Sequence, residues 1–260
     1  MRKDSSYYIR VYHFSNLIFG GRGLNSENSY FDGCLDSISY VNRAKNAAEI
    51  LRDATLVAFL SFDSSTLIDS GPLKINGIGT NYAFTSAGRV SKALTLSTSN
   101  SYVQISGLRR LGTSGWPYSI SIWVNPTSAT GGTIVHLSKT TSGASGWAIP
   151  MIGFTSSGRI AIHSWNGQSV SLTGPIIPVK KWTHIVATYS PTNGQRLYVN
   201  NALIGSSTAF TFSAGGAPMI ITLGSSIQTG QFYGSLDEFY VYARELTQSE
   251  ISDLYNNPMS

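Results

Sequence analysis

Acidic side chains are the residues that supply acid–base chemistry in most hydrolases, and the middle of this chain almost lacks them. Between Ser64 and Ser235 the sequence has one carboxylate, that of Asp69. Glycoside hydrolysis needs two carboxylates about 5 to 9.5 Å apart, and a Ser-His-Asp triad needs an acid that orients its histidine. The sequence therefore predicts a protein that is not an enzyme, with no catalytic residue.

The histidines and the cysteine add no catalytic or zinc-binding pattern. Of the four histidines, His184 follows Trp182 and Thr183 and is predicted to be a packed or hydrogen-bonded strand residue. The single Cys34 excludes an internal disulfide and a cysteine-based zinc site, because each needs at least two thiols. The residues present therefore require no cofactor.

Basic side chains give the strongest binding signal. The stretch from Ser64 to Ser235 has ten bases and one acid, so it carries 10 − 1 = +9, whereas the whole chain of 260 residues carries +5. Two pairs, Arg109-Arg110 and Lys180-Lys181, lie in loop-like positions. Such groups pair with sulfate or carboxylate, which predicts a polyanionic partner such as an acidic protein surface. Scattered surface bases are the alternative, and nucleic acid is disfavoured because no matching motif is present.

Tryptophans could add a platform for a sugar ring. Trp116, Trp147 and Trp165 lie near turn-like stretches and are candidates for exposed, ligand-binding rings. Trp123 alternates with Ile122 and Val124, so it points away from the core face. We expect a loop or the second sheet to cover Trp123.

The elements that position these residues are predicted to be short strands. Apolar, β-branched and aromatic residues recur between clusters of Gly, Asn, Ser and Pro, which is typical of an all-β sandwich. No apolar run approaches the roughly 18 residues needed to span a bilayer, so no membrane insertion is expected. One helix is predicted after Thr247, where Glu250 completes a capping box. The predicted strands are 56–63, 93–96, 102–106, 118–125, 133–138, 147–154, 159–165, 182–189, 195–199, 219–223 and 236–242.

An internal repeat divides the sequence. Residues 31–40 align with residues 232–241, so that Gly33 corresponds to Gly234, an offset of 234 − 33 = 201 residues. We therefore interpret residues 1–53 as the C-terminal remnant of one domain and residues 54–260 as a complete second copy. About fifty residues with two or three strands cannot bury a core of their own.

Several short motifs occur together in the order of a known family. They are Phe62-Asp63, Asp69-Ser70-Gly71, 121–126 (SIWVNP), 181–187 (KWTHIVA), 197–201 (LYVNN) and 232–239 (FYGSLDEF). With these motifs the chain resembles the laminin-G-like branch of the concanavalin A-like lectin/glucanase jelly rolls. The resemblance implies a two-sheet antiparallel jelly-roll sandwich with a short C-terminal helix, in which the first strand pairs beside the last.

The resemblance also carries expectations about metal, ligand and location. Jelly rolls of this kind often hold a structural Ca²⁺, and Asp63, Asp69 and Asp237 stand at motif positions that could converge to supply its oxygen ligands. The same aspartates could instead accept backbone hydrogen bonds at turns. Binding of an acidic glycan such as a glycosaminoglycan, or of another glycan, and an extracellular location within a longer chain are further implications.

These observations together predict a non-catalytic extracellular recognition module, one unit of a tandem array, that binds an acidic glycan or a protein. Its predicted ligand-binding residues are Arg109, Arg110, Lys180, Lys181, Trp116, Trp147 and Trp165. The alternatives are a structural spacer or adhesion module without its own ligand, and an accessory domain of a larger enzyme. A binding module should gather the basic pairs and a tryptophan on one surface.

Overall fold

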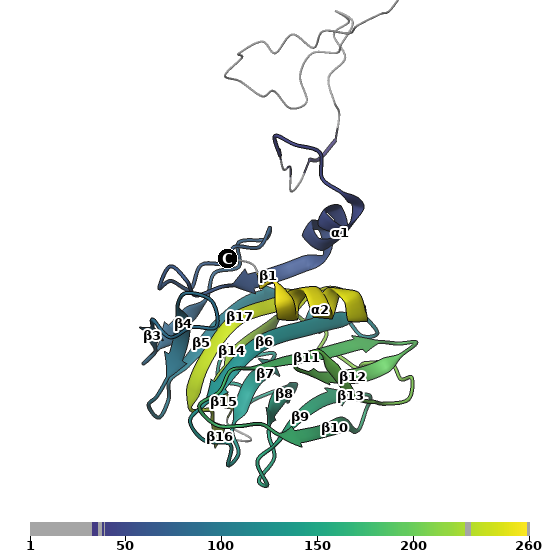
Figure 1. Cartoon of the computed structure of the whole chain (residues 1–260). Helices are drawn as coiled ribbons and strands as arrows, with labels where there is room; N and C mark the ends of the chain where they lie inside the picture. Colours follow the sequence, from purple (N-terminus) through teal and green to yellow (C-terminus); the bar gives the residue numbers. More distant parts are fainter. Residues whose placement is uncertain (1–32, 36–37, 39, 227–229, 259–260) are drawn as a thin grey trace, which may run out of the picture. The chain divides into compact units, whose positions relative to one another are not determined.

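The computed structural model describes residues 33–35, 38, 40–226 and 230–258 (Figure 1). The chain divides into two compact units, Met1–Ala44 and Lys45–Ser260. Most of the first unit, and with it most of the fragment predicted for residues 1–53, lies outside the described residues. No helix in the described part is long and apolar enough to cross a membrane.

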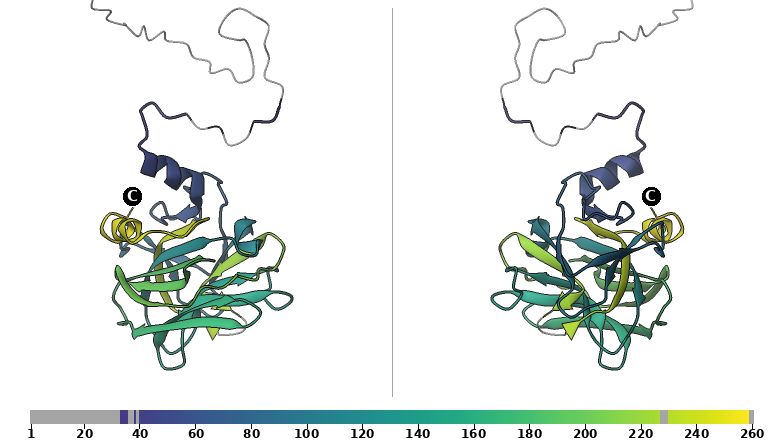
Figure 2. Two further views of the ribbon diagram at one scale, coloured as in Figure 1. Left: turned by 90° about the vertical axis from the view of Figure 1, so that its right-hand side faces the viewer. Right: turned by 90° about the vertical axis from the view of Figure 1, so that its left-hand side faces the viewer.

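Two antiparallel sheets face each other in the second unit (Figure 2). The eight-stranded sheet has the order β13-β12-β11-β6-β17-β4-β3, and β1 also pairs with β17, so the first and last strands are neighbours as predicted. Its strands are β1 (Leu56–Leu60), β3 (Ala83–Thr85), β4 (Ala93–Leu96), β6 (Tyr118–Pro126), β11 (Thr183–Ser190), β12 (Gly194–Val199), β13 (Ala202–Ser206) and β17 (Gly234–Tyr242).

The nine-stranded sheet has the order β10-β9-β8-β7-β14-β5-β2, with β15 and β16 attached beside β7. Its strands are β2 (Ile78–Thr80), β5 (Tyr102–Leu108), β7 (Thr133–Ser138), β8 (Ala148–Phe154), β9 (Arg159–Trp165), β10 (Ser169–Ile176), β14 (Met219–Leu223), β15 (Ser225–Ser226) and β16 (Gly230–Gln231). The predicted jelly-roll sandwich is thus confirmed. Every predicted strand is present, whereas β10, β13 and the short strands β2, β3, β15 and β16 were not predicted.

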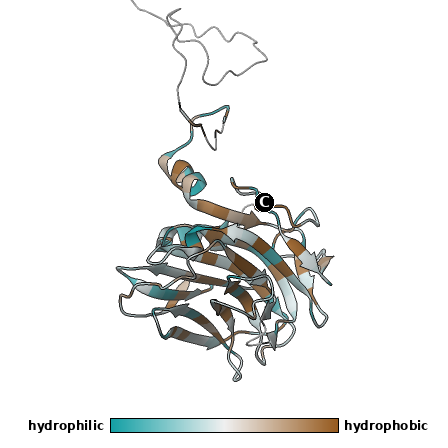
Figure 3. Ribbon diagram, turned by 180° about the vertical axis from the view of Figure 1, so that it is seen from behind, coloured by the Kyte–Doolittle hydropathy of each residue, from teal (hydrophilic) through white to brown (hydrophobic). Residues whose placement is uncertain are grey.

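The core lies between the sheets and follows from the alternation of side chains along each strand. Ile122 of β6 and Ile185 of β11 are cross-strand partners on the inner face of one sheet. Val103 of β5 and Ile221 of β14 lie on the inner face of the other. Figure 3 shows apolar residues recurring along the strands of both sheets.

Helix α2 (Gln248–Asn256) covers the outer face of the eight-stranded sheet. It begins at Thr247, whose hydroxyl accepts from the N–H of Glu250 in the predicted capping box. Ile251 is buried on this outer face, and the ring of Tyr255 stacks on Trp123 with centroids 5.4 Å apart. The expectation that Trp123 is covered is correct: helix α2 covers it together with Arg89 of a loop, whose guanidinium lies 4.4 Å from the ring centre, and the second sheet does not.

Helix α1 (Ala47–Thr55) reproduces α2 at the repeat offset. Asn46 forms a capping box with Glu49, as Thr247 does with Glu250, and both helices have nine residues. Their surroundings differ, because Ile50 is 56% exposed whereas Ile251 is fully buried. The brown, apolar part of α1 in Figure 3 therefore lacks the packing that the same face has in α2.

Candidate functional site

Arg109, Arg110 and Trp116 gather where the chain enters β6. Arg110 opens the short 3-10 helix η1 (Arg110–Gly112), and its guanidinium lies 3.9 Å from the centre of the Trp116 ring. The indole N–H of Trp116 donates to the carbonyl of Ala243 at 3.2 Å, which fixes the ring. Two of the predicted ligand-binding residues, Arg110 and Trp116, therefore form a cation–π contact. Exposed contacts of this kind stabilise by about 0.5–1 kcal/mol.

Lys180 and Lys181 lie at the other end of the same strand. The backbone N–H of Lys180 donates to the carbonyl of Pro126, the last residue of β6, at 2.7 Å. From Tyr118 to Pro126 there are eight residue steps, which span about 26 Å at roughly 3.3 Å per step. The two basic pairs therefore do not come together, and the Trp116 ring accompanies only the arginine pair.

The three candidate metal ligands are engaged with backbone N–H groups. Asp69 is fully buried and accepts from Phe59, Gly71 and Ile75. Asp237 accepts from the N–H groups of residues 89, 90 and 238, and Asp63 accepts from that of residue 92. Burial raises the pKa of Asp237 to about 7, and the nearby charge of Asp63 adds to the effect.

This arrangement does not fit a cation cage. In the part of the chain that the structure describes, no three side chains of His, Cys, Asp or Glu gather as metal ligands would. A Ca²⁺ ion takes six to eight oxygens, several of them from carboxylates. The aspartates organise turns in this structure, and the calcium site stays a prediction from the resemblance.

His184 lies beneath helix α2 and is almost completely buried. Its Nε2 lies 2.8 Å from the hydroxyl of Ser121, and its ring stacks on Trp123 with centroids 5.0 Å apart. Burial, with the charge of Arg89 adding to it, lowers the pKa of His184 to about 3. The prediction of a hydrogen-bonded strand histidine is correct.

Two neighbouring pockets lie against the nine-stranded sheet, one of them on its outer face. One row of cross-strand partners runs across this outer face, from Gln104 to Thr222, then to His136, then to Pro150. The loop 139–147 joins β7 to β8 and reaches over this row, because Gln104 donates through Nε2 to the carbonyl of Thr141 at 2.7 Å. The loop contributes residues to both pockets.

The first, which we call the polar pocket, has a volume of about 230 Å³. Thr141 and Gly143 of the loop form one of its walls. Gly143 has φ +65°, and a Cβ there would lie 3.1 Å from Nε2 of His136, so glycine allows the loop to approach the imidazole closely. The side chains at the base of the polar pocket are Tyr102, Gln104, His136 and Thr222.

His136 is the unusual residue of the polar pocket. Its side chain is 1% exposed, and neither ring nitrogen has a hydrogen-bond partner in the described chain. Burial lowers its pKa to about 4, so the imidazole is neutral at pH 7. A neutral imidazole has one donor and one acceptor, and each costs free energy when it is buried unpaired.

The second, which we call the aromatic pocket, has a volume of about 490 Å³. Trp147 and Trp165 line it together with Pro150 and His163. Trp147 is held in place by an edge contact with Phe212, at 5.7 Å between ring centroids. Of the three candidate tryptophans, the structure thus brings two together, and Trp116 does not line this pocket. None of the three is exposed as predicted, because all are half-buried and Trp147 and Trp165 pack partly against the core.

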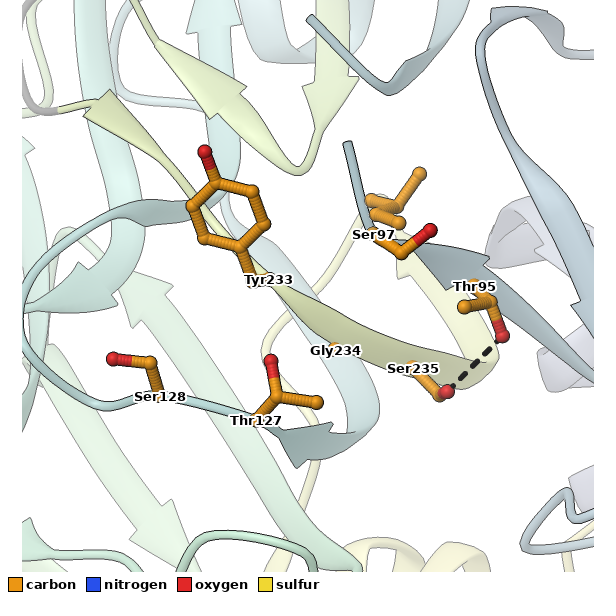
Figure 4. A pocket seen from close by; sticks show the side chains of 8 residues that line it. Thr95, Ser97, Thr127, Ser128, Tyr233, Gly234 and Ser235 are labelled. Atoms are coloured by element: carbon orange, nitrogen blue, oxygen red, sulfur yellow. Dashed lines mark hydrogen bonds between the residues drawn. The ribbon is translucent and has the colours of Figure 1, made fainter. Parts of the chain in front are cut away.

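A third pocket, of about 220 Å³, lies where β4, β6 and β17 meet (Figure 4). Six of its eight lining residues carry a hydroxyl group, and the ring of Tyr233 lies on one side. Thr95 and Ser235 share a hydrogen bond of 3.2 Å within it. The pocket is also less than half the size of the aromatic pocket. Its small size and its internal hydrogen bond make it the weaker candidate for a ligand site.

Sequence reasoning missed the polar pocket. His136 stands between Val135 and Leu137, whose side chains are in the core, so alternation alone assigns it to the outer face. The other residues of the polar pocket include Gln104 and Thr222, which come from β5 and β14. These strands are neighbours only in the folded sheet. The single available signal was a polar residue within an apolar strand.

Comparison with known proteins decides the family. The model of a family described as the concanavalin A-like lectin/glucanases superfamily (Laminin_G_3) matches residues 97–252. The chain belongs to this family. No curated protein matches the sequence.

Solved structures share the fold of this laminin-G-like chain. Domain 4 of AbnA, an extracellular arabinanase from Geobacillus stearothermophilus solved with arabinotriose, is 25% identical with a TM-score of 0.58, over 77% of this chain and 98% of that one. The binding domain of Paraclostridial Mosquitocidal Protein 1 is 22% identical with a TM-score of 0.60, over 78% and 52%. The ligand-binding domain of botulinum neurotoxin D, solved with N-acetylneuraminic acid, is 17% identical with a TM-score of 0.58, over 81% and 52%. These neighbours are binding domains, one of them within an enzyme.

Proposed function

We propose that this chain is a non-catalytic carbohydrate-binding module whose ligand lies against the nine-stranded sheet. The observation that carries the proposal is the pairing of Trp147 and Trp165 in one pocket of about 490 Å³. Ligand pockets have this size and combine apolar walls with a few polar groups. Indole rings held by packing offer flat apolar surfaces that fit the C–H faces of sugar rings.

The lack of acids in these pockets supports binding without catalysis. Neither the polar pocket nor the aromatic pocket has an aspartate or glutamate in its lining. The buried Asp69 and Asp237 are committed to backbone N–H groups elsewhere. The arabinanase relative is one domain of a larger enzyme, and we infer that this chain likewise serves as an accessory recognition domain of an extracellular protein.

The test is binding of uncleaved polysaccharides and oligosaccharides by the purified chain, measured by affinity electrophoresis and calorimetry on a panel that includes arabinan, xylan and β-glucan. For the glycan that binds the parent chain, Trp165→Ala should weaken binding about tenfold or more, since one aromatic contact is removed. Trp116→Ala is the matched control, because this ring lies under Arg110 and does not line the aromatic pocket. Equal losses in both variants, or binding to no glycan, would contradict the proposal.

A second candidate ligand is an acidic glycan or protein surface, which the charge of the central stretch favours. Arg109 and Arg110 concentrate two bases at the start of β6, beside the ring of Trp116. We expect retention on heparin to fall when Arg109, Arg110, Lys180 and Lys181 are replaced by alanine. Elution of the parent chain at low salt would show that its positive charges are scattered and screened by salt, which would contradict a localised polyanion site.

The repeat supports a place in a tandem array. Leu35, Ile38 and Tyr40 are exposed, whereas their counterparts 201 residues later, in β17, are buried in the core. Ile50 of α1 shows the same contrast with Ile251. We infer that residues 1–53 are the C-terminal remnant of another laminin-G-like unit. The chain then combines one complete module with the end of a neighbouring one.

A further inference from the structure

We propose that the two pockets form adjoining subsites for an uncharged oligosaccharide, and that His136 recognises a hydroxyl group of this ligand in the polar pocket. This inference rests on the proposed function, because it specifies the chemistry of the same binding site. It differs from the sequence-based expectation, which assigned an acidic ligand to basic side chains.

The hydrogen-bonding groups of the His136 imidazole are unpaired in the described chain. The residue is almost completely buried and lines the polar pocket. More than nine in ten buried polar groups in proteins are paired. Each exception needs an explanation, and for a group in a pocket wall a bound molecule that supplies the missing hydrogen bonds is one.

The chemistry of the partner follows from the imidazole. Neutral histidine offers one N–H donor and one acceptor nitrogen. A sugar hydroxyl both donates and accepts, so one or two neighbouring hydroxyls satisfy both ring nitrogens. Tyr102, Gln104 and Thr222 add further polar side chains around the same pocket.

The ligand should carry no charge. Lysine, arginine, aspartate and glutamate are absent from the linings of both pockets. A sulfate or carboxylate placed there would lose water without gaining a counter-charge, which is costly. Burial also lowers the pKa values of His136 and His163, so neither imidazole supplies a positive charge at pH 7.

The two pockets adjoin through the sheet itself. Pro150 lines the aromatic pocket and is the cross-strand partner of His136, and neighbouring strands lie about 4.8 Å apart. The loop 139–147 borders both, with Thr141 and Gly143 on one side and Trp147 on the other. A ligand of two or more sugar units can thus stack on the tryptophans and place a hydroxyl at His136.

The experiment compares the binding of uncharged and charged oligosaccharides to the parent chain and to folded variants. Arabinotriose, xylotriose and cellotriose are the uncharged probes, and trigalacturonate and a heparin-derived tetrasaccharide are the charged ones. We expect an uncharged probe to bind the parent chain, and His136→Leu to weaken it about tenfold, as expected for a lost pair of ligand hydrogen bonds. His136→Gln, which keeps one donor and one acceptor group, should retain most of the affinity.

Each outcome separates the two proposals. Binding that requires Trp165 but is unchanged in His136→Leu would overturn the histidine subsite and leave the proposed function standing. Tighter Trp165-dependent binding of a charged probe would overturn the uncharged ligand class. Loss of binding in every probe would overturn both proposals. A ligand-induced shift of the His136 ring ¹⁵N resonances would show direct contact, and unfolding curves establish that the variants are folded.

Discussion

Acidification provides a sharp test of the environment of His136. Its folded-state pKa is about 4, whereas an ordinary histidine titrates near 6.5. Between these values the unfolded chain binds a proton that the folded chain excludes. The free energy of unfolding should therefore fall as the pH falls from 6.5 to 4, and this contribution should be fully present above pH 6.5.

The magnitude follows from the pKa difference. A shift of about 2.5 units corresponds to about 3 kcal/mol at 1.36 kcal/mol per unit. His184, with a pKa of about 3, acts in the same direction. Asp237, with a pKa raised to about 7, acts in the opposite direction, because its folded form gains a proton on acidification. Both groups are present in His136→Leu, so the difference between parent and variant isolates His136.

Urea unfolding followed by tryptophan fluorescence at pH 7, 5.5 and 4 measures this difference. At pH 7 His136→Leu should be more stable than the parent by about 1–3 kcal/mol, because it removes unpaired buried polar atoms. The gap should widen by about 3 kcal/mol at pH 4. Parallel pH profiles for the two proteins would refute the assignment of a buried neutral imidazole, and a less stable variant at pH 7 would mean that the ring is paired.

Two further predictions concern packing and turns. Ile251→Ala should lower the free energy of unfolding by about 2–5 kcal/mol, whereas Ile50→Ala, at the repeat counterpart, should change it by less than about 0.5 kcal/mol. Comparable losses for the two variants in thermal or urea unfolding would show that α1 is packed like α2. Asp69→Ala should cost about 3 kcal/mol or more, because it leaves three backbone N–H groups around β1 unpaired, and Asp63→Ala, which loses one exposed bond, should cost under about 1 kcal/mol in the same assay.

Local patterns predicted most of the sandwich. The alternation along 118–125 assigned Ile122 to the core and Trp123 to the opposite face, because side chains alternate strictly in a strand. The capping box at Thr247 predicted where α2 begins, since its hydrogen bonds connect residues three apart. Which element covers Trp123 depends on the docking of α2, a long-range event with no local signal.

The site was only partly predictable for a related reason. Trp147 directly precedes β8 and Trp165 ends β9, and these strands form an antiparallel hairpin. The hairpin register therefore places the two rings at one end, and sequence reasoning could have paired them. The two basic pairs look alike in the sequence, but nine residues of β6 separate them in space. The polar pocket draws on β5, β7 and β14, so only the sheet order reveals it.

The two buried strand histidines show why the polar pocket points to a ligand. Both side chains are 1% exposed, and both lie on outer faces of the sandwich. His184 is covered by the helix, and its Nε2 is bonded to Ser121, so the fold itself supplies a partner. His136 is covered by a glycine-bearing loop that approaches its ring without bonding to either nitrogen. Nδ1 of His184 is also unpaired, but its Nε2 is bonded to Ser121, whereas His136 has no partner on either nitrogen in the described chain. This difference is what assigns His136 to recognition.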